Sequence, residues 1–415
     1  MRTLAVLFPL ALIGSIADVI KDALLNSNGI LYNILRADKW ISPSVMQVLR
    51  NCCNGLQTVT LGSIGLLAGF AAAKYTARLY GKDSQMAGMT AVIVELLIAY
   101  RFQRATDVSM FNIEWRLFSY HFLLLSLLIV FFVGQVFRWL GRAGQTDHLV
   151  EHALAVKQRS YDAMWPFVVC CFVGLIFGIL FNLGSYFSVF SNLNVSLQGL
   201  AADGNSTWVK AAMVMLSTVL EWLGLNGIYT FNVHLDSTAM ATNLSYVLSH
   251  GSSWHIPHRF IGSLIYQAYA EFGGAGVILA LLIALVIVSH DRDVNRLGKW
   301  TFLPVFFNVN PAVMIGVPVI LNPFYLLPML VLPLVNMGLA ILAILIHLVP
   351  ALAYPTMNSV PALLFGYMAT NGNLMTIVLA LLLLIIDVIV YIPFVRLAKA
   401  VEDRVIASDQ REDQR

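Results

Sequence analysis

Residues 303–336 read LPVFFNVNPAVMIGVPVILNPFYLLPMLVLPLVN, an apolar stretch whose prolines and asparagines decide the fold of the chain. The prolines are Pro304, Pro311, Pro318, Pro323, Pro328 and Pro333, and the asparagines are Asn308, Asn310, Asn322 and Asn336. One unbroken spanning helix is not expected, because each proline removes a backbone donor and clashes with the preceding turn. Irregular backbone persists at membrane depth only where protein buries it or where it lines a watery cavity. The stretch therefore indicates a broken, solute-binding segment; a set of proline-kinked helices with satisfied asparagines is the alternative.

The composition is typical of an all-α polytopic membrane protein. Of the 415 residues, 59% are hydrophobic and only 11% are charged, whereas roughly 25% of the residues of a soluble protein are charged. Long apolar runs recur from one end of the chain to the other. The net charge of +3 gives no reason to expect a nucleic-acid surface.

The cysteines and short motifs predict neither a metal site nor a cofactor. The four cysteines form two adjacent pairs, Cys52–Cys53 and Cys170–Cys171, and neighbouring cysteines do not easily bridge one another. Cys/His ligand spacings, phosphate-binding loops and nucleophile motifs are missing from the sequence. The residues alone therefore identify no catalytic group, and any energy source must come from another protein or from a gradient.

The N-terminal residues MRTLAVLFPLALIGSIADVIKDALL have the features of a signal peptide or of a first spanning helix. We favour the helix, because apolar residues resume after Asp18 and many further spans follow. Further spans are expected at 55–73, 86–100, 117–140, 165–187, 208–225, 273–289, 337–349 and 374–395, with a polar loop at 26–54, a charged loop at 290–299 and a partly disordered tail at 396–415. Residues 226–259 are too polar to cross lipid and long for a loop, which suggests a re-entrant segment. The total is nine or ten spans plus one or two re-entrant segments.

The distribution of basic residues predicts the orientation of the middle of the chain. Residues 141–161 contain Arg142, Lys157 and Arg159, whereas residues 188–207 contain neither Lys nor Arg. Basic loops stay in the cytoplasm, so we expect residues 141–161 inside and residues 188–207 outside. The bias is incomplete, because the arginines between 101 and 116 fall on the expected outer side.

Acidic and amide side chains within spans are costly and are functional candidates. The candidates are Glu221, Trp222, Tyr229, His234, Asp236, Trp254, Glu271, Asn308 and Asn310. Amides and carboxylates can bind paired hydroxyls while an aromatic face stacks on a ring, so this set points to a sugar. Each has a structural alternative: Glu221 can face a water-filled crevice, and His234 can cap a turn. Asp387 is expected to face the bundle interior, but no partner can be named for it.

Four motifs make the chain resemble enzyme IIC, the membrane permease of the lactose/cellobiose family of the phosphotransferase sugar-uptake system, as a divergent member. They are FPLALIGS at 8–15, WLGLNG at 222–227, FGGAG at 272–276 and FNVNPAVMIGVPVILNP at 307–323. The resemblance implies ten transmembrane helices, two re-entrant hairpins and a homodimer in the bacterial inner membrane. It also implies that residues 1–190 supply the dimer interface, that residues 208–395 bind the sugar, and that residues 396–415 are a cytoplasmic tail.

Members of this family hand the sugar to a phosphorylated cytoplasmic IIB protein, itself served by IIA, which phosphorylates the 6-hydroxyl. Two positions depart from the family pattern. WxxGxHG has a histidine where this chain has Asn226, and FNxNEPxxxG has a glutamate where it has Pro311. Neither residue accepts a proton at neutral pH, so general-base help worth about 10²–10⁴ in rate is lost there. Glu221 or Glu271 is a candidate substitute.

We therefore predict a permease that imports a disaccharide or β-glycoside by an elevator-like movement of its C-terminal half, with weakened phosphotransfer. Asn308 and Asn310 are expected to contact sugar hydroxyls. The other expected site residues are Glu221, Trp222, Asn226, His234 and Glu271. Two alternatives stay open: a phosphorylation-independent facilitator or channel, and a non-transporting membrane receptor or assembly protein on the same fold.

Overall fold

The computed structural model describes residues 2–101, 113–141, 161–186, 207–225, 227, 238–289, 291–357 and 359–413. Within these ranges every named element is a helix, and extended pairing is limited to two isolated bridges. The all-α class is therefore confirmed. The chain divides into two compact units: unit 1 contains Met1–Ala11, Thr58–Ser196 and Leu223–Leu225, and unit 2 contains Leu12–Gln57, Leu197–Trp222 and Asn226–Arg415.

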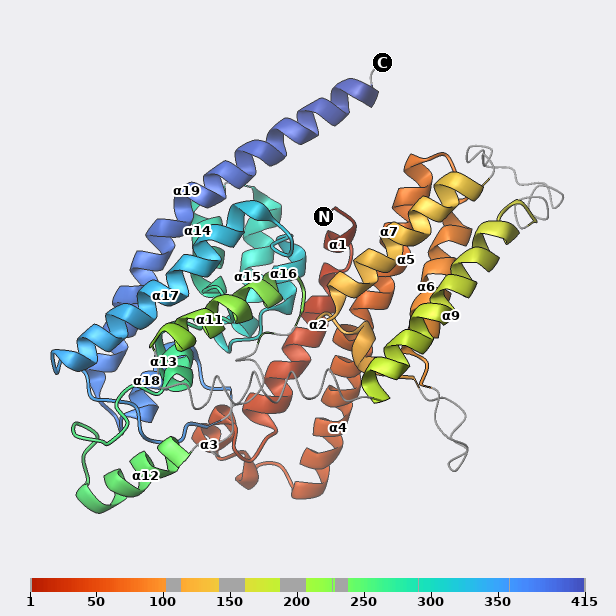
Figure 1. Ribbon diagram of the computed structural model, residues 1–415. Coiled ribbons are helices and arrows are strands. Elements are labelled where there is room, and N and C mark those ends of the chain that lie inside the picture. Colours follow the sequence, from red (N-terminus) through yellow and green to blue (C-terminus); the bar gives the residue numbers. More distant parts are fainter. Residues whose placement is uncertain are drawn as a thin grey trace. The chain divides into compact units, whose positions relative to one another are not determined.

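Unit 1 is built on four apolar helices (Figure 1). Its elements are α1 (Arg2–Ala5), η3 (Leu61–Ser63), α5 (Ile64–Leu79), α6 (Ser84–Ala99), η4 (Trp115–Phe118), α7 (Leu123–Leu140) and α9 (Met164–Tyr186). Helices lie where spans were expected at 86–100, 117–140 and 165–187; they are α6, α7 and α9, of which α7 and α9 are long and apolar enough to cross a membrane. Leu223–Leu225 joins this unit through the Leu123 N–H, which donates to the Gly224 carbonyl at 3.1 Å.

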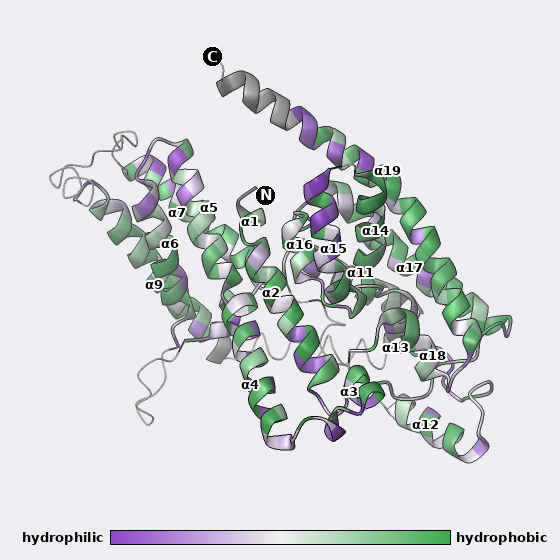
Figure 2. Ribbon diagram, turned by 180° about the vertical axis from the view of Figure 1, so that it is seen from behind, coloured by the Kyte–Doolittle hydropathy of each residue, from purple (hydrophilic) through white to green (hydrophobic). Residues whose placement is uncertain are grey.

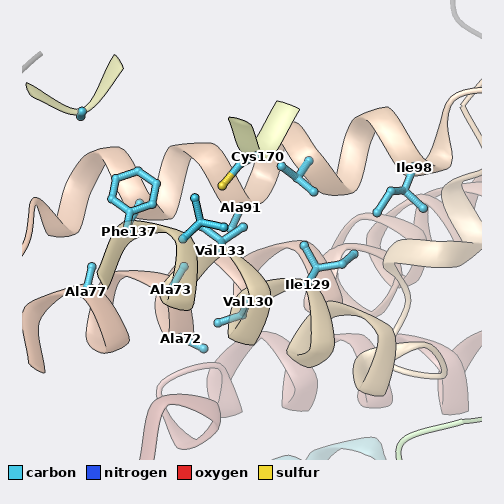
Figure 3. Packing of buried hydrophobic residues seen from close by; sticks show 14 residues of the cluster. Ala72, Ala73, Ala77, Ala91, Ile98, Ile129, Val130, Val133, Phe137 and Cys170 are labelled. Carbon is cyan, nitrogen blue, oxygen red and sulfur yellow. The ribbon is translucent and has the colours of Figure 1, made fainter. Parts of the chain in front are cut away.

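Small residues let the helices of unit 1 approach closely. Figure 3 shows Ala73 of α5, Ala91 of α6 and Val133 of α7 gathered with Phe137 and Cys170, and all five are at most 1% exposed. Apolar side chains gain little by leaving lipid for a protein interior, so close backbone approach and van der Waals contact stabilise such bundles.

The region expected to be a polar loop, 26–54, is largely helical, so that prediction is wrong. It contains α3 (Ile30–Leu35), η2 (Ala37–Lys39) and most of α4 (Pro43–Thr60), after α2 (Phe8–Val19) and the π-helix η1 (Ile20–Leu24). Polar and apolar residues of α4 alternate at helical spacing, as in PSVMQVLRNCCNGLQTVT. Amphipathic patterning lowers the average hydropathy of a window without preventing a helix.

Unit 2 contains the remaining helices, most of which are short (Figure 1). They are α11 (Thr207–Trp222), α12 (Thr238–His250), α13 (Gly262–Tyr269), α14 (Ile278–Val288), α15 (Arg292–Phe306), α16 (Pro311–Gly316), α17 (Pro323–Leu345), α18 (Ala362–Ala369) and α19 (Leu374–Asp413). The charged loop expected at 290–299 is wrong, because α15 begins there. The Asp291 side chain caps α15 by accepting from the Asp293 N–H at 3.2 Å, and N-terminal caps of this kind stabilise charged helices.

The proline-rich stretch is broken, as expected, between α15 and α16 and again between α16 and α17. Pro311 and Pro323 occupy the first turn of a helix, where the missing N–H would have no partner within the helix. Pro328 and Pro333 lie inside α17, which runs unbroken to Leu345. The prediction that a separate span begins at Met337 is therefore wrong, because apolar helices tolerate internal prolines when neighbouring groups satisfy the freed carbonyls.

Five helical segments of the described chain are long and apolar enough to cross a membrane, and Figure 2 shows mostly hydrophobic residues along α9. They are Pro43–Leu79, Leu123–Leu140, Met164–Gly184, Pro323–Leu345 and Leu374–Arg404; shorter apolar helices cover Ser84–Ala99, Ala211–Trp222 and Ile278–Val288. Residues 396–413 continue α19 as a helix, so the partial disorder expected there is wrong for those residues. Ten spans and two re-entrant hairpins stay a prediction.

Candidate functional site

Asn308 fixes the turn between α15 and α16. Its backbone is left-handed (φ 63°), a conformation that asparagine tolerates better than most residues. Its Oδ1 accepts a hydrogen bond from the Gly273 N–H at 2.9 Å, and its Nδ2 lies 3.4 Å from the Val360 carbonyl. Both ends of this amide are thus engaged within the protein, and they hold the turn against the FGGAG stretch.

The glycines of FGGAG make this close approach possible. Gly273, Gly274 and Gly276 have φ values of 79°, 105° and 74°, which glycine adopts without steric cost. A Cβ on Gly274 would collide with the side-chain amide of Asn310, whose Cγ lies 2.8 Å from the ideal Cβ position. The glycine stretch therefore provides the space in which the Asn310 side chain lies.

Asn310 meets a carboxyl group from another helix. Its side chain lies close enough to interact with the carboxyl group of Glu221, near the end of α11. Both residues are buried, at 8% and 9% exposure, and one carboxyl oxygen, Glu221 Oε1, has no hydrogen-bond partner among the described residues. Gly227 packs against the same carboxyl group and leaves no room for a side chain. A buried oxygen without a partner is unfavourable, so this atom is suited to a ligand hydroxyl.

Glu271, the residue before FGGAG, interacts electrostatically with Glu221. Two carboxyls and one amide, from three segments far apart in sequence, thus converge in unit 2. These residues (Glu221, Glu271 and Asn310) form what we call the carboxyl–amide cluster.

Trp222 anchors the end of α11. Its indole N–H donates to the Asn322 carbonyl at 2.9 Å, and its own carbonyl accepts from the Leu321 N–H at 3.0 Å. Trp222 is therefore tied to the turn between α16 and α17, directly beside the cluster residue Glu221.

The other expected site residues are not part of this cluster. Asn226 and His234 lie outside the described residues, as do Tyr229 and Asp236. Trp254 lines a different cavity of about 310 Å³, together with Tyr354, Thr370 and Asn371. The Thr370 hydroxyl of that cavity is already bonded to the Gly366 carbonyl.

The partner of Asp387 could not be found from the sequence. The structure pairs it with Asn336, whose Nδ2 donates to Asp387 Oδ2 at 2.8 Å. The two residues lie on α17 and α19, and their separation along the chain leaves no spacing signal that would have linked them.

Comparison with known proteins decides the family. The family model described as "Phosphotransferase system, EIIC" matches residues 1–333. The chain belongs to this EIIC family. It is therefore a membrane permease component of a phosphotransferase system.

Two relatives illustrate the similarity. The oligo-beta-mannoside-specific EIIC component of Bacillus subtilis (strain 168) is 24% identical over 94% of this chain and 86% of its own length. The cellobiose-specific EIIC component of Lactococcus lactis subsp. lactis (strain IL1403) is 34% identical over 33% of this chain and 28% of its own. Among solved structures, the chain is similar to the transporter ChbC, the IIC component from the N,N'-diacetylchitobiose-specific phosphotransferase system. That match has 21% identity and a TM-score of 0.44, and it covers 99% of this chain and 96% of the other.

In an EIIC protein, the place of Pro311 matters. It directly follows Asn310 and begins α16, at the position where the resemblance led us to expect a glutamate. The interaction between Asn310 and Glu221 places a carboxyl group of α11 near the residue before this proline.

Proposed function

We propose that the protein imports a β-linked disaccharide or related β-glycoside, and that Asn310 and Glu221 bind its hydroxyls. The observation that carries the proposal is the buried carboxyl group of Glu221, which interacts with Asn310 and Glu271 and has one oxygen without a hydrogen-bond partner among the described residues. A few polar groups converging in a buried pocket give a binding site its specificity. The names of the relatives, for oligo-beta-mannoside, cellobiose and lichenan, support this sugar class.

The contacts favour different roles for the two asparagines. Both polar atoms of the Asn308 amide are hydrogen-bonded within the protein. We therefore assign Asn308 to stabilising the turn rather than to sugar contact. Trp222 likewise donates its indole N–H to the Asn322 carbonyl, and this bond positions the end of α11. Asn226 and His234 stay candidates for sugar contact.

We assign to Glu221 the acceptance of the proton from the sugar hydroxyl that receives the phosphoryl group. Pro311 offers no ionisable group, whereas Glu221 brings its carboxyl to the adjacent Asn310. The phosphoryl donor is a IIB protein served by IIA. Lactose-specific EIICB relatives, which the chain matches over part of its length, support such a partner.

Sugar phosphorylation by vesicles with phosphorylated IIB tests the assignment. We expect Glu221→Gln to slow sugar phosphorylation by about 10²–10⁴, the usual worth of general-base catalysis, while the Kd for the sugar changes by less than about tenfold. The matched control is Glu95→Gln in unit 1, where the carboxyl is also buried, and it should leave both quantities unchanged. Phosphorylation by Glu221→Gln at the wild-type rate would contradict the role of Glu221.

A phosphorylation-independent facilitator is the second candidate, favoured by Asn226 and Pro311 at the positions expected to be ionisable. Uptake of labelled cellobiose and other β-glycosides into vesicles without IIB distinguishes the two. Accumulation that requires phosphorylated IIB supports the permease, and equilibration without IIB supports the facilitator. If the protein neither binds nor takes up any β-glycoside or galactoside, both candidate functions are contradicted.

We also propose that the chain forms a homodimer in the bacterial inner membrane and moves its C-terminal half, 208–395, against an N-terminal half, 1–190, that supplies the dimer interface. The apolar side chains that α9 leaves exposed support a surface covered by lipid or by a second copy. Light scattering of the detergent-purified protein measures the mass. A monomer would contradict the dimer.

A further inference from the structure

The interior of unit 2 contains a polar pair that the carboxyl–amide cluster does not include. Asn336 of α17 and Asp387 of α19 are both 0% exposed. The Asn336 Nδ2 donates a hydrogen bond of 2.8 Å to Asp387 Oδ2. This bond uses one half of each side chain, because a carboxyl group and a carboxamide each present two polar atoms side by side.

The other two atoms of the pair have no partner. Asp387 Oδ1 and Asn336 Oδ1 are buried without a hydrogen bond to any described residue. While Asp387 is ionised, both atoms are acceptors and cannot bond to each other. A proton on Asp387 Oδ1 converts the two unpaired acceptors into one donor and one acceptor.

The helices around Asp387 offer no compensating cation. α19 packs along α13, α14, α17 and α18, and none of these four helices contains Lys, Arg, His, Asp or Glu. On α19 itself the nearest charged residue is Arg396, roughly 13 Å further along the helix axis. A buried carboxylate without a cation is far less favourable than the neutral acid.

The other titratable groups that face this region are phenols. Tyr391, one turn beyond Asp387 on α19, interacts electrostatically with Asp387 and with Tyr325 of α17. The Tyr391 hydroxyl donates to the Gly276 carbonyl, and Tyr269 of α13 packs against Gly366 of α18. Phenols are neutral at pH 7, so they supply no charge to balance a carboxylate.

We propose that Asp387 is a proton-binding site: at neutral pH it holds a proton on Oδ1 and donates it to Asn336 Oδ1. The two hydrogen bonds then close a ring between the acid and the amide and join α17 to α19. The ligand is a single proton, taken up from water as the helices pack, and no other bond forms or breaks. The ring lies one helical turn from Tyr391, which is bonded to the glycine stretch that accommodates Asn310. The ring therefore fixes α17 and α19, the helices next to the glycine stretch of the carboxyl–amide cluster.

Infrared difference spectroscopy of the full-length protein in detergent at pH 7 tests the protonation directly. We expect the wild type minus Asp387→Asn spectrum to contain the carbonyl stretch of a protonated carboxylic acid, shifted in D₂O. Bands from Glu95, Glu221 and Glu271 are common to both proteins and cancel. If the spectrum instead shows the loss of a carboxylate band, Asp387 is ionised and the proposal is wrong. A buried water that bridges Asp387 Oδ1 and Asn336 Oδ1 would also contradict it.

Matched variants test the ring. Asp387→Asn preserves two hydrogen bonds, because its amide can donate to Asn336 Oδ1, and its Tm should stay within about 2 °C of the wild type. Asp387→Leu leaves both polar atoms of Asn336 unpaired and should lower the Tm by roughly 5 °C or more. Equal losses in the two variants would show that the fold requires the charge, and equal stability would show that the ring is not formed. Either outcome overturns the proposal.

Discussion

The helices of the two units pack, and satisfy their backbone polar groups, in different ways. In unit 1, α5, α6 and α7 are uninterrupted and pack through alanine, glycine and valine, and the carboxyl group of Glu95 fits against Gly69. In unit 2, the chain breaks at 307–310 and 317–322, and side-chain amides and glycines with positive φ complete the backbone contacts. Unbroken helices satisfy their own backbone groups, whereas breaks leave groups that side chains or ligands must satisfy. Asn310 of the carboxyl–amide cluster lies at the first of these breaks.

The largest effect is expected at Gly274 of unit 2. Gly274→Ala forces a side chain into a backbone with φ of 105° and into the amide of Asn310. Strain and overpacking together cost about 2–5 kcal/mol, so sugar binding should weaken by at least about tenfold in a ligand-binding assay on purified protein. The control is Gly338→Ala in α17, where nothing lies within 4 Å of the new methyl group. Equal sugar affinity in the two variants would show that binding does not depend on the space that Gly274 leaves for the Asn310 side chain.

The corresponding change in unit 1 should affect stability and leave binding intact. Gly69→Ala places a methyl group against the Glu95 carboxyl, whose Cδ lies 3.0 Å from the ideal Cβ position. Overpacking of this kind costs about 1–3 kcal/mol and should lower the Tm by roughly 5 °C. Gly62→Ala, whose nearest neighbour is Thr58 Cγ2 at 3.8 Å, is the control. A loss of sugar affinity in the Gly69 variant would contradict the separation of the two roles.

A smaller effect should separate the two hydrogen bonds of Asn308. Asn308→Ala removes the acceptor of the Gly273 N–H and places alanine in a left-handed backbone, at a cost of about 1–3 kcal/mol. Asn308→Asp keeps the acceptor for the Gly273 N–H but places a carboxyl oxygen against the Val360 carbonyl, so it should cost less than Asn308→Ala where the bond to Gly273 dominates. Thermal unfolding of both proteins measures the difference. Identical Tm values would mean that the bond to Gly273 does not stabilise the turn.

The smallest effect is expected at Pro311. It stands at the first position of α16, where a backbone N–H needs no partner within the helix. Pro311→Ala should therefore change the Tm by no more than about 2 °C. A larger decrease would show that the proline ring itself holds the start of α16. The double change Asn226→His with Pro311→Glu then tests whether these two groups restore the rate of sugar phosphorylation. If the double variant binds sugar but phosphorylates it no faster, the reaction depends on other groups.

Hydropathy predicted the uninterrupted helices well and the amphipathic ones poorly. The spans that became α6, α7 and α9 are apolar on all sides, so any averaging window detects them. The starts of α4 and α15 mix charged and apolar residues, and their helical character depends on periodicity and on the Asp291 cap. The prolines of α17 were read as breaks because a sequence does not show which neighbours satisfy the freed carbonyls.

The carboxyl–amide cluster could be anticipated only in part. Glu221, Glu271 and Asn310 stood out because carboxyls and amides are rare in apolar segments. The distinct role of Asn308 depends on its φ of 63° and on the Gly273 N–H, which no residue spacing reveals. The bond between Asn336 and Asp387 joins two helices through tertiary packing alone, so the sequence offered the acid without its partner.

The position of Pro311 also has a consequence for substitution. Because the first residue of a helix contributes little to its hydrogen bonding, a change of residue there leaves the backbone bonds of α16 intact. The constraint on Pro311 therefore comes from its buried side chain, so a substitution there has to suit the surrounding packing and polarity rather than the geometry of the helix.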